Sequence, residues 1–81
     1  MGDTSFLVFG AGAWGTALSL QLNKSGNKVY LSSFDSTNLS SIASTRINQK
    51  YLPGVSLPDE IEVTGLNQEL FKKIDCVVIC V

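Results

Sequence analysis

The sequence contains no histidine, only two cysteines and a single tryptophan in 81 residues. Without histidine, metal sites that need imidazole and Ser-His or Cys-His nucleophile pairs are excluded, and we expect no metal site. Six lysines and arginines stand against seven acidic residues, so the chain lacks the basic surface that nucleic-acid binding requires. No run approaches the roughly 20 apolar residues of a membrane span. Since 44% of the residues are hydrophobic, one small globular domain remains as the expected class.

The two cysteines, Cys76 and Cys80, lie four positions apart on an expected strand. At that spacing their side chains face the same side but are about 13 Å apart, which is too far for a disulfide. The spacing also differs from the CxxC motif of redox and zinc sites. Buried free thiols and a cytoplasmic location are therefore expected, and the N-terminus shows no signal-peptide pattern.

The most informative stretch is a Gly-x-Gly-x-x-Gly motif formed by Gly10, Gly12 and Gly15. An apolar run precedes it and a helical period follows, which is the strand–turn–helix context of a dinucleotide-binding turn. Gly10 permits the tight turn, Gly12 lets the backbone approach a pyrophosphate, and Gly15 lets the helix pack closely on the strand. Free N–H groups near Ala13 and Trp14 then point at the anion. The alternative is a glycine-rich turn that binds nothing.

The expected order of elements is β-α-β-α-β-α-β. This order predicts an α/β fold with a Rossmann-like parallel sheet and a right-handed first crossover. The first and last strands are apolar on both faces, as in the middle of a parallel sheet. Because the chain stops at such a strand, we expect residues 1–81 to be the first part of a dinucleotide-binding domain. Strands are expected over 5–9, 28–32, 61–64 and 75–81, and helices over 13–24, 35–47 and 68–72.

Several local features refine these elements. The first helix carries one face made of Trp14, Ala17, Leu18, Gln21 and Leu22, and Gly26 suits the position after its end. The second helix is rich in serine, so we expect it to be short or irregular, with Asp35 or Ser36 as its N-cap. Asn67 can cap the third helix. Residues 48–60 are expected to form a non-repetitive loop with a type II turn at Pro53-Gly54.

Three blocks together resemble one family: GAGAWGTAL at 10–18, NQKYLPGVSLP at 48–58 and DCVVICV at 75–81. They look like the N-terminal part of the bacterial-type NAD(P)-dependent glycerol-3-phosphate dehydrogenases. The resemblance implies NAD or NADP as cofactor and hydride transfer between sn-glycerol 3-phosphate and dihydroxyacetone phosphate, in glycerophospholipid synthesis. It also implies a separate substrate domain and a homodimer in the complete enzyme. The family's substrate-binding lysines lie past the fourth strand, so no residue here is expected to be catalytic.

The resemblance also assigns cofactor contacts. Ala13 and Trp14 precede the third glycine and should touch the cofactor, while Ser33 and Phe34 stand at the tip of the second strand, beside the adenosine ribose. Ser33 is neutral where many dinucleotide folds have an acidic residue, and Phe34 replaces a basic residue but its ring could stack on adenine. Since residues 29–45 contain no Arg or Lys, the choice between NAD and NADP stays open with a slight preference for NAD.

Each of these assignments has an alternative. Trp14 could instead pack against the loop at Tyr51-Leu52. Ser32, Ser33 and Ser36 could hydrogen-bond the ribose or only begin the next helix. For the whole chain, the alternatives are another Rossmann dehydrogenase, a non-catalytic dinucleotide-sensing module, or an inactive truncated product. Another Rossmann dehydrogenase should lack the NxxYLPGxxLP block and usually keep an acidic residue in place of Ser33. A sensing module should also have an acidic strand tip, and should bind the dinucleotide without turnover. None of Lys50, Lys72 and Lys73 is expected to be a substrate-binding lysine of the family. Lys50 belongs to the YLPG loop, and Lys72 and Lys73 lie on a short helix, where solvated charges are ordinary.

Overall fold

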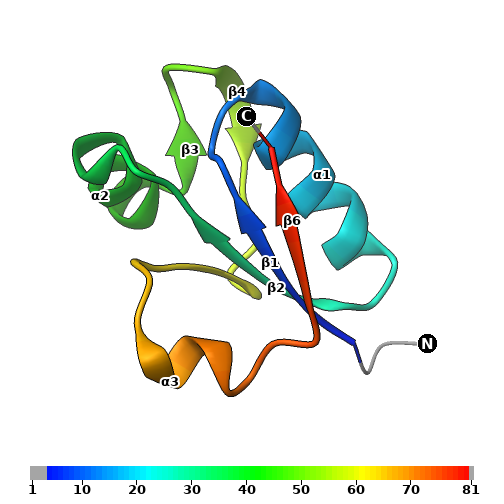
Figure 1. The fold of residues 1–81 in the computed structure, drawn as a ribbon. Coiled ribbons are helices and arrows are strands. Elements are labelled where there is room, and N and C mark those ends of the chain that lie inside the picture. The colour runs from blue at the N-terminus through cyan, green and yellow to red at the C-terminus, as the bar shows by residue number, and fades with distance from the viewer. Residues whose placement is uncertain (1–3, 81) are drawn as a thin grey trace.

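The computed structural model describes residues 4–80, and Figure 1 shows its arrangement. Four strands form a parallel sheet in the order β5-β2-β1-β6, and β3 pairs with β4 in a separate antiparallel pair. Val81, which was expected in the last strand, lies outside the described residues. The strands are β1 (Ser5–Phe9), β2 (Lys28–Ser32), β3 (Ile47–Asn48), β4 (Leu52–Ser56), β5 (Ile61–Val63) and β6 (Cys76–Ile79), and the helices are α1 (Ala13–Lys24), α2 (Ser36–Thr45) and α3 (Gln68–Phe71).

The parallel sheet confirms the expected α/β, Rossmann-like fold. Counted along the chain, its strands lie in the order third, second, first, fourth, so the chain reverses its direction of travel across the sheet at β1. Strand β1 pairs in register with both neighbours, Leu7 facing Tyr30 on β2 and Val77 on β6. Its central place explains why Leu7 and Val8 are both buried although they face opposite sides.

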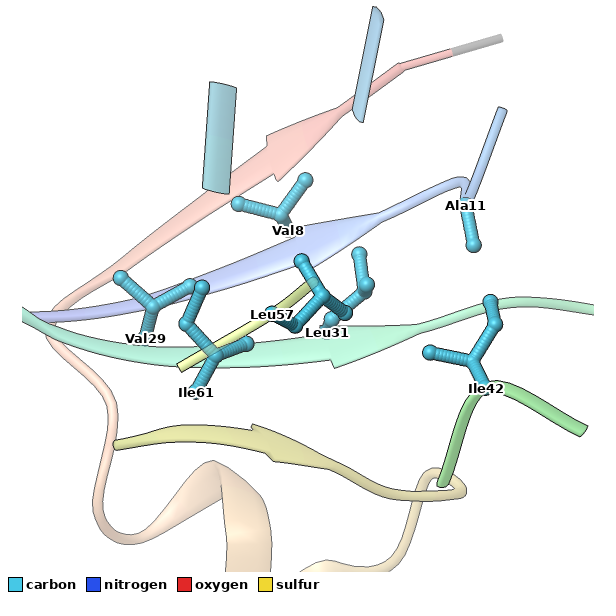
Figure 2. Close-up of a cluster of buried hydrophobic side chains, with 7 residues drawn as sticks. All are labelled: Val8, Ala11, Val29, Leu31, Ile42, Leu57 and Ile61. Atoms are coloured by element: carbon cyan, nitrogen blue, oxygen red, sulfur yellow. The ribbon is translucent and has the colours of Figure 1, made fainter. Parts of the chain in front are cut away.

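Two apolar clusters hold the layers together. Helices α1 and α2 pack on one face of the sheet, and α3 covers the other face through Leu70, which packs with Leu7 and Tyr30. Burial of these side chains supplies the main stabilisation of so small a domain. The larger cluster, drawn in Figure 2, consists of Val8, Ala11, Val29, Leu31, Ile42, Leu57 and Ile61.

Helix α1 does not bury the face that its sequence pattern indicated. Trp14 and Ala17 are exposed, and the residues buried against the sheet are Gly15, Thr16 and Ser19. Small side chains allow the helix axis to approach the strands closely, and the Ser19 hydroxyl bonds back to the Gly15 carbonyl at 2.8 Å. The expected amphipathic face was therefore wrong in part: Trp14, Ala17 and Gln21 are exposed, whereas Leu22 packs on the core cluster beside the small buried residues.

The helix ends agree with the sequence signals. Gly26 follows α1 with φ of 93°, and Asp35 and Asn67 accept hydrogen bonds from the first turns of α2 and α3 at 3.0 and 2.9 Å. Helix α2 is a regular helix of ten residues that ends at Thr45, so of the two expected alternatives it is short, ending before residue 47, and not irregular. Its serines do not interrupt it, because Leu39 and Ile42 bury one side of the helix against the core.

Residues 48–60 are not a non-repetitive loop. Strand β3 pairs with β4, with Ile47 opposite Ser56 and Asn48 opposite Leu52. The three residues Pro53–Val55 between these pairs have no partner on β3 and form a bulge, which a φ of 83° at Gly54 accommodates. The positive φ agrees with the turn expected at Pro53-Gly54, but the turn lies within a strand.

Strand β6 is not a buried strand in the described residues. It pairs with β1 on one side only, and Val77 and Ile79 are exposed although both are apolar. Cys76 is also exposed and Cys80 is half-buried, so the expected burial of the thiols was wrong, while both cysteines are free as expected. None of the helices within residues 4–80 is long and apolar enough to cross a membrane.

The close approach of α1 to the sheet yields a stability prediction. A Cβ atom at Gly15 would overlap the carbonyl oxygen of Gly10, which is backbone and has little room to move. Gly15→Ala should therefore lower the free energy of unfolding by about 3 kcal/mol or more, measured by urea denaturation followed by circular dichroism. The matched control is Gly65→Ala, where a Cβ meets nothing within 4 Å and stability should change by no more than about 0.5 kcal/mol. Equal free energies of unfolding for Gly15→Ala and Gly65→Ala would refute the close contact between Gly15 and the Gly10 carbonyl.

Candidate functional site

A pocket of about 370 Å³ opens at the carboxyl ends of β1 and β2. It lies beside the point at which the strand order reverses, between β1 and β6. Open α/β sheets bind their ligands at this point, so the pocket is the candidate site. Its lining consists of Phe9, Gly10, Ala11, Gly12, Ser33, Phe34, Asp35, Asn38, Tyr51 and Cys80.

The glycine turn forms the floor of this pocket. Gly10 has φ of 121°, donates its N–H to the Ser32 carbonyl at 2.9 Å, and has no space for a Cβ because the Cys80 carbonyl lies there. At Gly12 the opposite holds, since a Cβ would meet no atom within 4 Å. A tight turn is thus built at Gly10, whereas Gly12 exposes bare backbone to whatever enters the pocket.

The N-terminus of α1 points its free backbone N–H groups toward this turn. Its N-cap residue, Gly12, makes no side-chain cap, and the first turn carries no acidic residue. In contrast, α2 and α3 are capped by Asp35 and Asn67. No side chain therefore neutralises the partial positive charge at the N-terminus of α1. A pyrophosphate group would complement this charge and would fit the open space at Gly12.

The second wall of the pocket is the tip of β2. Phe34 is 84% exposed and meets Phe9 edge to face, with ring centroids 4.9 Å apart. An exposed ring on this wall is free to stack on a flat base. Ser33 lines the pocket. Its hydroxyl also accepts a hydrogen bond from the Asp35 N–H at 3.2 Å, so it stabilises the turn between β2 and α2 as well. Ser32 is fully buried and does not line the pocket.

Ala13 and Trp14 do not line the same pocket. They border a separate apolar hollow of about 290 Å³ together with Ala17 and Leu52. The Trp14 side chain is 85% exposed, so it lies beside Leu52 without being buried against the loop. Of the expected site residues, the structure brings Gly10, Gly12, Ser33 and Phe34 together, places Ala13 and Trp14 next to them in the chain, and buries Gly15 beneath the turn.

Sequence reasoning missed an acidic residue in the pocket. Asp35 lines it and stands 20 residues after Gly15, which is the ordinary distance from the third glycine to the acidic residue of a dinucleotide site. The sequence pattern assigned Asp35 only to the cap of α2, and the register argument had placed the neutral Ser33 in the position of the acid. That spacing from Gly15 was the signal that could have found it.

A second missed residue is Asn48, which is fully buried beneath the glycine turn. Its amide nitrogen donates to the Ala11 carbonyl at 2.7 Å and to the Thr16 hydroxyl at 2.9 Å. Its amide oxygen lies 3.4 Å from both the Asn38 side-chain nitrogen and the Tyr51 N–H. Asn48 thus connects β3 to the glycine turn, to α1 and to α2, and holds the floor of the pocket in place.

Loss of this connection should be measurable. Asn48→Ala leaves the buried Ala11 carbonyl without a partner, and we expect a loss of about 2–4 kcal/mol in the free energy of unfolding. Thr16→Val tests the second bond, and the double variant should show a coupling energy of about 0.5–3 kcal/mol between the two positions. Additive effects of the two substitutions would show that the bond between Asn48 and Thr16 carries no energy.

The Asp35 carboxylate yields a prediction about pH. Its hydrogen bond from the Asn38 N–H holds the pKa of Asp35 below the ordinary value of 3.8. A lowered pKa means that the charged form supports the start of α2 above that value and loses this support as the pH falls through the folded pKa. The amide resonance of Asn38 in an NMR titration should therefore move at a pH below 3.8. A midpoint above that value would contradict the capping bond.

Comparison with known proteins identifies this arrangement. The family model described as "NAD-dependent glycerol-3-phosphate dehydrogenase N-terminus" matches residues 5–81. The chain belongs to this family. A crystal structure of the glycerol-3-phosphate dehydrogenase of Coxiella burnetii superposes with a TM-score of 0.87 at 28% identity, covering 95% of this chain and 24% of that protein.

Similar curated proteins carry the same name. The glycerol-3-phosphate dehydrogenase [NAD(P)+] of Pelotomaculum thermopropionicum is 50% identical over 66 residues, covering 80% of this chain and 19% of the relative. That of Thermoanaerobacter is 42% identical over 74 residues, covering 91% of this chain and 22% of the relative. The chain thus spans about a fifth of the length of these relatives, and corresponds to the N-terminal part of the family.

Proposed function

We propose that this chain binds NAD or NADP and forms the first part of the cofactor domain of a glycerol-3-phosphate dehydrogenase. The observation that supports this most directly is the pocket at the strand reversal, with open backbone at Gly12 and no side-chain cap on α1. The pyrophosphate would lie on the N–H groups of α1. The exposed Phe34 ring would meet the adenine, and Ser33 or Asp35 the ribose. Ala13 and Trp14 would border the cofactor on the side of the separate apolar hollow.

The proposed reaction of the whole protein is the interconversion of sn-glycerol 3-phosphate and dihydroxyacetone phosphate. The bound dinucleotide supplies the hydride acceptor or donor for this reaction. The residues of this chain would bind and orient the cofactor, and no catalytic residue is assigned among them, because the pocket lining offers one carboxylate, Asp35, and no amine. Family membership favours this substrate over those of other Rossmann dehydrogenases, and an enzyme over a sensing module.

Three further expectations join the proposal. A cytoplasmic location accords with the two free cysteines. A homodimer of the complete protein stays a prediction. Nucleic acid is not a proposed partner, since acidic and basic residues nearly balance.

Binding can be tested on the chain itself, because Trp14 is its only tryptophan and follows Gly12 of the pocket by two residues. Titration with NADH should quench Trp14 emission in a saturable way, with a folded far-ultraviolet circular dichroism spectrum on the same sample. Gly12→Asp should weaken NADH at least about tenfold, because its charge repels the pyrophosphate, while Asp remains a good N-cap. Gly12→Asn has the same size and no charge, and should weaken binding less.

The outcomes separate clearly. A folded chain without quenching would refute dinucleotide binding by this chain. Equal affinities of Gly12→Asp and the unchanged chain would place the pyrophosphate away from α1. In the complete protein, reduction of dihydroxyacetone phosphate by NADH should fall with Gly12→Asp in the same proportion as binding.

A further inference from the structure

A basic side chain lies beside the tip of β2, although residues 29–45 contain no Arg or Lys. Lys50 belongs to the turn between β3 and β4, and its Nζ is 3.5 Å from Oδ2 of Asp35. The same Nζ lies 5.2 Å from the centre of the Tyr51 ring, and Tyr51 itself lines the pocket. The antiparallel pair thus brings a positive charge to a wall whose own sequence has none.

Lys50 and Asp35 border a second hollow, of about 450 Å³. Asp35 and Asn38 line both this hollow and the main pocket, so the two adjoin at the start of α2. Every residue that lines the hollow is polar or charged by type, and Lys50 supplies its one positive charge. The lining consists of Asp35, Thr37, Asn38, Ser41, Gln49 and Lys50.

The geometry of dinucleotide sites relates this hollow to one atom of the cofactor. With the pyrophosphate at the glycine turn, the adenosine ribose lies beyond the tip of the second strand. Its 2′ position would lie near the acidic residue that follows the glycine motif by about 20 residues, which here is Asp35 before the start of α2. An acidic residue in this place binds a free 2′-hydroxyl, and a nearby basic residue accommodates a 2′-phosphate.

We propose that Lys50 binds the 2′-phosphate of NADP(H) and so raises the affinity of this chain for NADP(H) relative to NAD(H). The inference rests on the proposed dinucleotide site. Without a phosphate, Asp35 holds the ammonium group at the rim of the hollow. The two side chains are 57% and 44% exposed, and an ion pair so exposed is weak and exchanges readily. A phosphate offers more charge and more acceptor oxygens than one carboxylate, so it displaces Asp35 from Lys50.

Asp35 opposes this binding. Its Oδ1 is engaged by the Asn38 N–H at 3.0 Å, and the remaining charge repels a 2′-phosphate while it can accept a bond from a 2′-hydroxyl. The two residues therefore act in opposite directions on the ratio of the two affinities. Lys50 raises the affinity for NADPH, and Asp35 lowers it.

The test measures dissociation constants of NADH and NADPH for the full chain and for Lys50→Gln. NADPH should bind at least about tenfold more weakly to Lys50→Gln, with NADH changed by less than about twofold. The matched control is Lys24→Gln, which removes the same charge from the last turn of α1, far from the tip of β2. In that variant the ratio of the two affinities should stay constant.

A second variant tests the opposing residue. Asp35→Asn keeps a good N-cap and removes the negative charge, so NADPH should bind several-fold more tightly, by roughly threefold or more. Adenosine fragments locate the effect on the cofactor. Lys50→Gln should weaken adenosine 2′,5′-bisphosphate and leave adenosine 5′-monophosphate unchanged, since only the former carries the 2′-phosphate.

The results distinguish the inference from the function on which it rests. If neither NADH nor NADPH binds to the folded chain, both are overturned. If both cofactors bind and Lys50→Gln alters their affinities equally, or alters neither, the inference alone is overturned and the dinucleotide site stands. A loss of NADPH affinity that Lys24→Gln reproduces would show a general charge effect, and would likewise overturn it.

Discussion

The rest of the structure depends on the contact between the backbone of Gly10 and the first turn of α1. Only the residues 10–12 separate β1 from α1, and the place where a Cβ of Gly15 would lie is already filled by the Gly10 carbonyl. With no side chain between them, the helix begins directly over the carboxyl end of the strand. That position aims the free N–H groups of α1 at the pocket and buries Thr16 and Ser19 fully, whereas the larger Leu20 and Leu22 are only partly buried against the core.

The turn at residues 10–12 needs stabilising contacts from elsewhere in the chain. Two of its three residues are glycines, so it has almost no side-chain contacts of its own. Asn48 supplies stabilising contacts from another part of the chain, by donating to Ala11 within the turn and to Thr16 on the helix. Arg46 fixes the other end of the β3–β4 segment to β5, since its guanidinium donates to the Pro58 and Ile61 carbonyls and its backbone carbonyl accepts from Leu57. The β3–β4 segment is therefore part of the architecture of the site, even though it is not part of the main sheet.

Much of the fold could be predicted from the sequence because its signals are local. The strands of the parallel sheet, the three helices and their caps at Gly26, Asp35 and Asn67 each depend on neighbouring residues. The paired strands β3 and β4 could not be predicted, since a two-residue strand opposite a bulge has no periodicity. The fully buried positions of α1 were missed because they hold small residues, and the apolar Leu20 and Leu22 are only partly buried beside them.

The site could be predicted only in part, for the same physical reason. The glycine turn is a local feature, and the structure gives each glycine the space that its expected role requires. The association of Asp35 with Lys50 joins residues 15 positions apart through the fold of the β3–β4 segment, and no pattern in the sequence reports it. An ion pair between residues that are distant in the sequence can be identified only from the folded structure.

The described residues make one side of a dinucleotide crevice much more complete than the other. On the β2 side, the glycine turn, Phe34 and Asp35 form a continuous wall backed by the buried core. On the β6 side, the pocket is bordered by Cys80 alone, and the apolar Val77 and Ile79 are exposed next to it. In a doubly wound sheet, each half of the strands holds one mononucleotide, and the first half holds the adenosine part. Under the proposed dinucleotide binding, the adenosine side would therefore be determined within this chain, and residues close to its start would govern the choice between the two cofactors.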